Sequence, residues 1–157
     1  MYEIWIPIII SVASLAMAVF AFYRARPIEQ KQYDSESMLT SFRILSDEEM
    51  RRYKKIISEE RRTLVKENRP LVFNRTEAIV GYADKIEESY NEVSALYQHN
   101  LLNKEHFKSV YGGGLVVWWK ILRADIDAKQ TPRGSICKHF KEVAQEFMDS
   151  GIDDEPY

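Results

Sequence analysis

The feature that most constrains this chain is the run from Ile4 to Tyr23, IWIPIIISVASLAMAVFAFY, which contains no charged residue. A helix rises about 1.5 Å per residue, so a helix of this length spans roughly 30 Å, the thickness of a bilayer's hydrocarbon core. Trp5 and Tyr23 stand near its two ends, and aromatic rings collect at membrane interfaces. The sequence therefore predicts a single transmembrane anchor over residues 1–26.

A cleaved signal peptide is the alternative interpretation of this run, with AMA at residues 16–18 as its cleavage site. No basic segment precedes the run, because only the α-amine offsets Glu3, and the apolar residues continue through Phe22. Both observations favour a retained anchor.

Flanking charge predicts the orientation of the anchor. Arg24, Arg26 and Lys31 follow the run, whereas Glu3 precedes it. The positive-inside rule then places the N-terminus outside and the large C-terminal part in the cytoplasm. The single cysteine, Cys137, is consistent with a reducing compartment.

One side of the predicted anchor carries small residues at alternating steps of three and four. Such stripes let two helices approach closely in lipid, although small residues are also common in membrane helices that do not associate. The candidate residues for self-association of the anchor are Ser11, Ser14, Ala18 and Ala21, and Ala25 continues their spacing.

The rest of the chain predicts a linker over 27–35, an all-α domain over 36–149 and an acidic tail over 150–157. A short helix over 36–45 is expected to bury one apolar face. Ser46, with Glu49 three residues later, forms a capping box that opens the next helix, which we expect to end near Glu67. The residues expected on the buried face of the short helix are Met38, Leu39, Phe42 and Leu45.

A longer apolar stripe follows, at three- and four-residue steps, and it predicts a helix of five turns. Its members are Ile79, Tyr82, Ala83, Ile86, Tyr90, Val93 and Tyr97. A last helix is expected over 135–148, and no segment alternates with the two-residue period of a strand. The predicted fold is an all-α bundle of about five helices behind a transmembrane helix.

Three glycines, Gly112 to Gly114, interrupt this pattern. A phosphate-binding loop needs lysine and then serine or threonine after its last glycine, whereas Leu115 and Val116 stand there. The glycines therefore predict a joint with a left-handed residue, between a short helix over 104–111 and a helix over 115–129. We expect that second helix to be the centre of the bundle, with Trp118 and Trp119 both buried.

The segment from Asn91 to Phe147 resembles a bacterial family of membrane-tethered helical proteins of unknown function, DUF family 4760. The positions that fit its pattern are Asn91, Glu92, Leu102, Asn103, Glu105, Trp119 and Phe140. The chain departs from the pattern at Lys129 and Gln130, where an arginine commonly ends the helix. The resemblance implies a helical domain beside an anchor in the bacterial inner membrane, and it implies no activity.

Polar residues of two predicted helices form the candidate site: Glu88, Asn91, Glu92, Arg123 and Asp125. Glu88 and Glu92 are expected to share a helix face. They would hold a cation or a basic partner there, or they would form a solvated acidic face. Glu92 and Arg123 are a candidate ion pair inside the bundle.

No catalytic, cofactor or metal site is predicted. His99, His106 and His139 lack metal-ligand spacing, and Cys137 has no second cysteine. Charge is too dispersed for a nucleic-acid partner. The predicted function is a membrane-anchored interaction or regulatory module, whose partners are the bilayer and a protein or a second copy. The alternatives are an oligomeric membrane-perturbing effector with a cytoplasmic sensor domain, and a membrane-tethered hydrolase.

Overall fold

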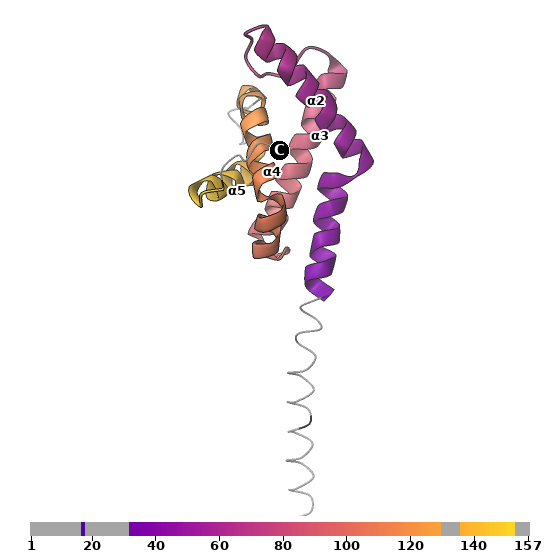
Figure 1. The fold of residues 1–157 in the computed structure, drawn as a ribbon, viewed down its shortest axis with the longest axis vertical. Coiled ribbons are helices and arrows are strands. Elements are labelled where there is room, and N and C mark those ends of the chain that lie inside the picture. Colours follow the sequence, from indigo (N-terminus) through magenta and orange to yellow (C-terminus); the bar gives the residue numbers. More distant parts are fainter. Residues whose placement is uncertain (1–16, 18–31, 130–135, 153–157) are drawn as a thin grey trace, which may run out of the picture. The chain divides into compact units, whose positions relative to one another are not determined.

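A computed structural model describes Met17, residues 32–129 and residues 136–152 of the chain. Its backbone contacts divide the chain into two compact units, residues 1–36 and 37–157. In the first unit, Met17 and residues 32–36 are helical. In the described part of the second unit every regular element is a helix (Figure 1), so the all-α prediction is confirmed.

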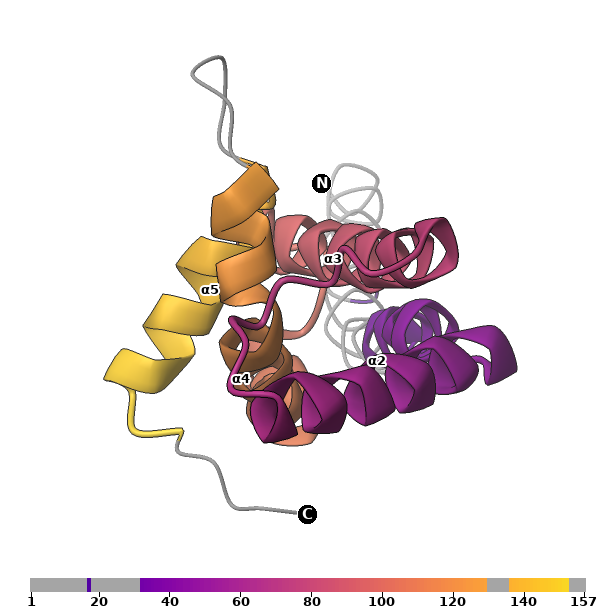
Figure 2. The ribbon, with the colours of Figure 1, turned by 90° about the horizontal axis from the view of Figure 1, so that it is seen from above.

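The second unit begins with helical residues 37–46 and continues with four labelled helices. These are α2 (Glu48–Lys66), α3 (Glu77–Gln98), α4 (Lys104–Lys129) and α5 (Lys138–Asp149). Helix α3 packs against α2, α4 and α5, whereas α2 and α5 lie on different sides of the unit (Figures 1 and 2). The central helix is therefore α3, and the prediction of the tryptophan-bearing α4 as the centre is wrong.

Side-chain caps fix where three of these helices begin. Asp47 accepts a hydrogen bond from the Met50 amide at 2.6 Å, so the predicted cap at Ser46 is wrong by one residue. Thr76 caps α3 and Asn103 caps α4 in the same way, at 3.2 and 3.0 Å. Each cap satisfies an amide that has no partner within its helix.

The three glycines lie inside α4, which runs unbroken from Lys104 to Lys129. The prediction of a joint is therefore wrong, and none of the three has a positive φ, which among the described glycines only Gly151 shows. A glycine costs a helix about 1 kcal/mol relative to alanine. Burial of Phe107 before the glycines and of Leu115 after them outweighs that cost.

Gly112 is the glycine that the packing requires. A Cβ atom there would lie 2.9 Å from Ile152 Cδ1 and 3.4 Å from Phe147 Cδ2, because α5 and Ile152, three residues beyond its end, pack against α4 at this point. Gly113 and Gly114 would meet nothing within 4 Å. The close approach of other side chains to α4, and not a turn, therefore explains why residue 112 is a glycine. It does not explain Gly113 or Gly114.

Aromatic side chains from α3, α4 and α5 form much of the core. Tyr90 stacks on Phe140 with ring centroids 5.0 Å apart, and Trp119 meets Phe140 edge-on at 5.4 Å. Trp119 is buried, whereas Trp118 is half-buried and stacks on Tyr90 at 6.5 Å. The prediction that both tryptophans are buried is thus confirmed for Trp119 alone.

The predicted transmembrane run over 4–23 and its small-residue stripe lie outside the described residues, apart from Met17. Among the helices that are described, none combines the length and the apolar character that crossing a bilayer requires. Residues 32–35, predicted as the end of a linker, are helical.

Candidate functional site

Helical residues 37–46 place their polar and apolar side chains opposite to the usual arrangement. Leu39 is 54% exposed and Phe42 is 49% exposed, whereas Ser37 and Ser41 are only 8% and 2% exposed. The predicted buried face is therefore wrong for Leu39 and Phe42, whereas Leu45 is buried and Met38 is half-buried. The helix turns two serines toward the domain and two large apolar side chains, Leu39 and Phe42, toward solvent.

Hydrogen bonds explain why serines suit the inner side of this helix. The Ser37 hydroxyl accepts a hydrogen bond from the backbone amide of Asn103 at 3.1 Å. The Ser41 hydroxyl donates to the Ser37 carbonyl, also at 3.1 Å. Small side chains let the helix approach the start of α4 closely, and each buried hydroxyl has a partner, as buried polar groups require.

We call Leu39 and Phe42 the outer face. Residues three apart on a helix point about 60° from each other, so these two side chains form one surface. Ser41 lies two residues from Leu39, and Ser37 lies two residues on its other side, so both serines point to the opposite side of the helix. Each exposed side chain forgoes part of the roughly 1.5–3 kcal/mol that its full burial would contribute.

Lys54 of α2 holds the end of the same helix. Its ammonium donates to the Leu45 carbonyl at 2.8 Å and lies 4.9 Å from the ring centre of Tyr90 and 5.8 Å from that of Trp118. Burial lowers the pKa of Lys54 to about 8, and Asp47 opposes the shift. The helix end is thus anchored by a partly desolvated cation between aromatic rings, so the orientation of the outer face is set by the core.

A second polar arrangement lies where α3 meets the end of α4, and we call it the acid–lysine cluster: Asp84, Glu87, Asp125 and Lys129. The Lys129 ammonium lies 2.7 Å from Asp84 Oδ1, 3.2 Å from both Glu87 oxygens and 2.5 Å from Asp125 Oδ2. Glu87 and Asp125 are 2% and 1% exposed. Three carboxyl groups therefore share one half-buried cation.

The cluster also fixes the loop between α2 and α3, because Asp125 Oδ1 accepts the Phe73 amide at 2.6 Å. Burial raises the pKa of Glu87 to about 8, with Lys129 opposing and Asp125 adding to the shift. Burial lowers the pKa of Lys129, but hydrogen bonds to Asp125 and Asp84 outweigh it and the net shift is upward. The raised pKa favours the protonated form of Glu87 beside the Lys129 ammonium, which limits the net charge of the cluster.

Cys137 begins α5 near these carboxylates, in a left-handed conformation with φ of 57°. Burial raises the pKa of its thiol to about 12, and the charge of Glu87 contributes. A thiol with so high a pKa is a poor nucleophile, because the thiolate is the reactive form.

The predicted site residues do not converge. Asp125 joins the acid–lysine cluster, and Asn91 Oδ1 accepts the Phe140 amide at 3.2 Å, which caps α5 where Cys137 cannot. Glu88 is exposed and pairs with Lys85 at 2.7 Å. Glu92 and Arg123 are both exposed, so the predicted ion pair inside the bundle is wrong.

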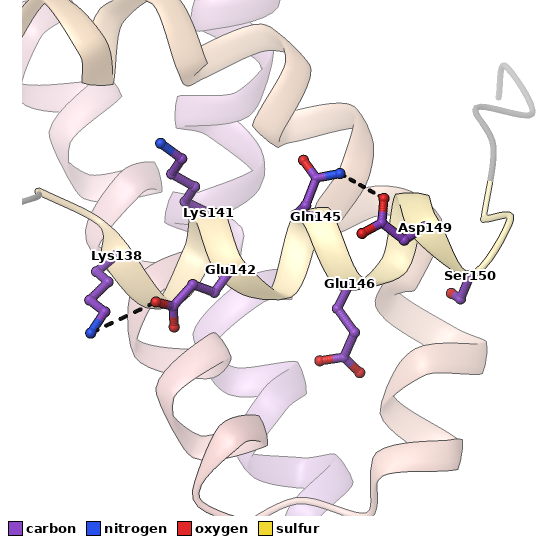
Figure 3. A pocket seen from close by; sticks show the side chains of 7 residues that line it. All are labelled: Lys138, Lys141, Glu142, Gln145, Glu146, Asp149 and Ser150. Atoms are coloured by element: carbon purple, nitrogen blue, oxygen red, sulfur yellow. Dashed lines mark hydrogen bonds and ion pairs between the residues drawn. The ribbon is translucent and has the colours of Figure 1, made fainter.

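Helix α5 carries a shallow depression lined by polar side chains (Figure 3): Lys138, Lys141, Glu142, Gln145, Glu146, Asp149 and Ser150. Lys138 points toward Glu142, and Gln145 donates to Asp149 at 2.7 Å (Figure 3). Glu146 accepts the Tyr97 hydroxyl of α3 at 2.7 Å. These contacts are helix-surface and helix-docking interactions, and they do not enclose a ligand.

The rings of His99 and His139 lie 6.1 Å apart, between α3 and α5. His139 Nδ1 lies 2.5 Å from Gln98 Oε1, so this nitrogen already has a partner. Within residues 32–129 and 136–152, no group of three or more acidic, histidine or cysteine side chains is arranged to hold a metal ion.

Sequence reasoning missed Ser37, Ser41, Lys54, Glu87 and Lys129. A signal for the cluster exists in the sequence, since Asp125 stands one helical turn after the apolar Ile121 and Leu122, and Lys129 follows it by one further turn. Comparisons with protein-family models, curated proteins and solved structures found no match to this chain. The family resemblance therefore stays a prediction.

Proposed function

We propose that this chain is a membrane-anchored interaction module whose cytoplasmic helical domain presents the outer face to a protein. The exposure of Leu39 and Phe42 on a helix that buries serines is the observation that carries the proposal. An amphipathic helix that served only its own domain would bury its apolar side instead. Aromatic side chains such as phenylalanine are enriched in protein interfaces.

The acid–lysine cluster and the Lys54 contacts support a scaffolding role for the rest of the domain. Their buried charges are satisfied by other groups of the same domain, at distances of 2.5–3.2 Å. Such contacts hold α2, α3, α4 and the α2–α3 loop together, and they position the helix that bears the outer face. The charge-free run over 4–23 supports the membrane location.

Photo-crosslinking with the full chain in its native membrane tests the proposal. A photoreactive residue at Phe42 should give a discrete protein adduct, and adding Leu39→Glu on the same face should abolish it. The matched control is the same residue at Lys55, which is exposed on α2. Adducts to lipid alone, or equal adducts at both positions, would overturn the proposed function.

The location is tested separately. A C-terminal reporter that is active only in the cytoplasm should give signal, because basic residues follow the anchor and Glu3 precedes it. Activity of a periplasm-specific reporter instead would contradict both the orientation and the compartment.

A further inference from the structure

We infer that the solvent side of α2 binds anionic lipid headgroups at a membrane surface through a line of basic side chains. The inference goes beyond the proposed function, because it concerns a different surface, and it takes from that function only the location at a membrane. Three observations on α2 carry it: the line that the basic residues form, their lack of ion pairs, and the residue types that are missing around them.

Basic residues form a line along the exposed side of α2, and we call it the basic stripe: Arg51, Lys55, Arg62 and Lys66. Steps of four, seven and four residues keep these positions within about 60° around the helix axis, over a length of about 22 Å. Arg52 and Arg61, also exposed, flank the line. Met50, Ile57 and Leu64 are buried on the opposite side. The stripe therefore points away from the core, on a helix at the outside of the domain (Figure 2).

The domain does not neutralise these charges. Neither the four stripe residues nor Arg52 and Arg61 form an ion pair with another residue in the part of the chain that the structure describes. Glu60 lies 3.5 Å from Arg75, and only 11% of its side chain is exposed. Glu59 is then the one exposed acidic residue between positions 51 and 66 of the described helix, against six exposed basic residues. The exposed side of α2 thus carries a net positive charge that an anionic partner can offset.

A shallow hollow lies at the C-terminal end of the stripe, and its lining is Arg61, Arg62, Val65 and Lys66. Arginine donates to phosphate oxygens in a fixed fork, and lysine binds them as a point charge. Val65 is 60% exposed in the midst of the three cations. The hollow therefore suits the phosphate of a lipid headgroup, with the valine beside it as an apolar contact.

The residue types that the stripe lacks favour lipid over protein or nucleic acid. Val65 is the only large apolar side chain exposed on α2, whereas the centre of a protein interface is apolar and depleted of charge. A base would find no exposed aromatic ring on α2 to stack on, because Tyr53 is half-buried and stacks on Tyr82 at 5.0 Å. Clusters of roughly four to eight basic residues on an amphipathic helix are typical of attraction to anionic lipids.

Binding through the stripe would be electrostatic. The apolar side of α2 already packs in the core, so it does not enter the lipid. Each basic residue near an anionic surface strengthens attachment by about fivefold. Salt screens such attraction, so the attachment should weaken as ionic strength rises.

A polarity-sensitive fluorescent label in the hollow tests the inference with the full chain. Val65→Cys is labelled, and the chain is reconstituted in vesicles of phosphatidylcholine alone or of phosphatidylcholine mixed with the anionic phosphatidylglycerol. The emission should shift to shorter wavelength only in the anionic vesicles, and high salt should reverse the shift. The unsubstituted chain controls for labelling of Cys137, which is buried. Equal emission in the two kinds of vesicle would overturn the inference.

Removal of charge tests the stripe itself. In the labelled chain, Arg51→Gln with Lys55→Gln should weaken the attachment by about 25-fold, and neither residue lines the hollow that holds the label. Lys138→Gln with Lys141→Gln is the matched control, since both lysines are exposed on α5 and the change in net charge is the same. This control should leave the shift unchanged, and both double variants should keep the melting temperature. Equal weakening in the two double variants would overturn the stripe as the binding surface.

Duplex DNA tests the choice of lipid as the occupant. Added to the labelled chain in neutral vesicles, it should leave the emission unchanged. A shift with DNA and none with phosphatidylglycerol would overturn the lipid in favour of a nucleic acid.

The two proposals fail in different ways. Absence of the lipid-dependent shift, together with a protein adduct at Phe42, would overturn the lipid surface and leave the proposed function standing. A lipid-dependent shift without any protein adduct at Phe42 would overturn the proposed partner of the outer face and leave the basic stripe as a lipid-binding surface.

Discussion

The acid–lysine cluster and helical residues 37–46 both depart from the usual separation of polar and apolar groups, in opposite directions. The cluster places Glu87 and Asp125 in the interior, at 2% and 1% exposure, whereas the helix leaves Leu39 and Phe42 about half exposed. The buried carboxyl groups find their cation and amide partners within the chain. The exposed apolar pair is the surface at which we propose a protein partner.

The two departures differ in what they cost the fold. A buried charge is costly unless it is paired, so the cluster exists only because its members neutralise one another. An exposed leucine or phenylalanine is tolerated by the fold and costs only the burial that it forgoes. Substitutions should therefore change stability strongly at the cluster and weakly at the outer face.

Removing the shared cation should have the largest effect. We expect Lys129→Met to lower the free energy of unfolding by about 3 kcal/mol, because the buried Asp125 loses its cation. Urea unfolding of the full chain measures the change. Lys138→Met is the matched control, since its pair with Glu142 is exposed and 3.7 Å long, and it should cost under about 1 kcal/mol. Equal losses in both variants would remove the contrast between the regions.

The protonated carboxyl group of the cluster should make stability depend on pH. The pKa of Glu87 is about 8 in the folded chain and 4.5 in its ordinary state, so the folded state binds the extra proton between these values. Stability should accordingly fall as pH rises through this window, and the loss should be complete above the folded pKa.

Glu87→Gln should remove this contribution, because the amide imitates the protonated carboxyl group at every pH. The measurement is the difference in unfolding free energy between the variant and the unsubstituted chain, at several pH values from about 5 to about 9. Glu88→Gln, at an exposed position, is the control. A difference that stays constant across the window would show that Glu87 does not hold the proton.

The buried serines of residues 37–46 can be tested in the same way. Ser41→Leu should lower the free energy of unfolding by about 1–3 kcal/mol, since the site is 2% exposed and closely packed against the domain. Leu39→Ser, the mirror change on the outer face, should alter it by less than about 0.5 kcal/mol. Thermal melting of both variants gives the comparison, and a larger effect at Leu39 would invert the assignment of the two sides.

Helix α4 connects the two regions, and its glycines should give the smallest effect. Gly113→Ala should raise the free energy of unfolding by about 0.5–1 kcal/mol, because a Cβ there meets nothing and alanine favours the helix. Gly112→Ala should gain less or lose, because Ile152 must move from its position 2.9 Å away. Chemical denaturation of the two variants side by side would reveal the order, and a greater gain at residue 112 would contradict the close approach.

Apolar spacing and helix-capping residues predicted the helices correctly where the residues of the apolar pattern are the ones that the fold buries. The stripe from Ile79 to Tyr97 corresponds to α3, the Asn103 cap to the start of α4, and Gly151 to the end of α5. The patterns misjudged Gly112 to Gly114, because local propensity opposes a helix there while the apolar period continues across them, from Phe107 to Leu115. Burial in the tertiary structure outweighed the low helix propensity of the glycines, and the helix continues.

The sequence by itself determined that the domain is helical, where most of its helices begin and end, and that a charge-free run of membrane-spanning length precedes it. These properties depend on near neighbours along the chain, so spacing and caps express them. Only the tertiary structure decided that serines face inward on residues 37–46, and that Glu87, Asp125 and Lys129 share one site. Burial and charge pairing also join residues that are far apart in the chain, such as Glu87 and Lys129, which are 42 positions apart, and local spacing does not specify such partners.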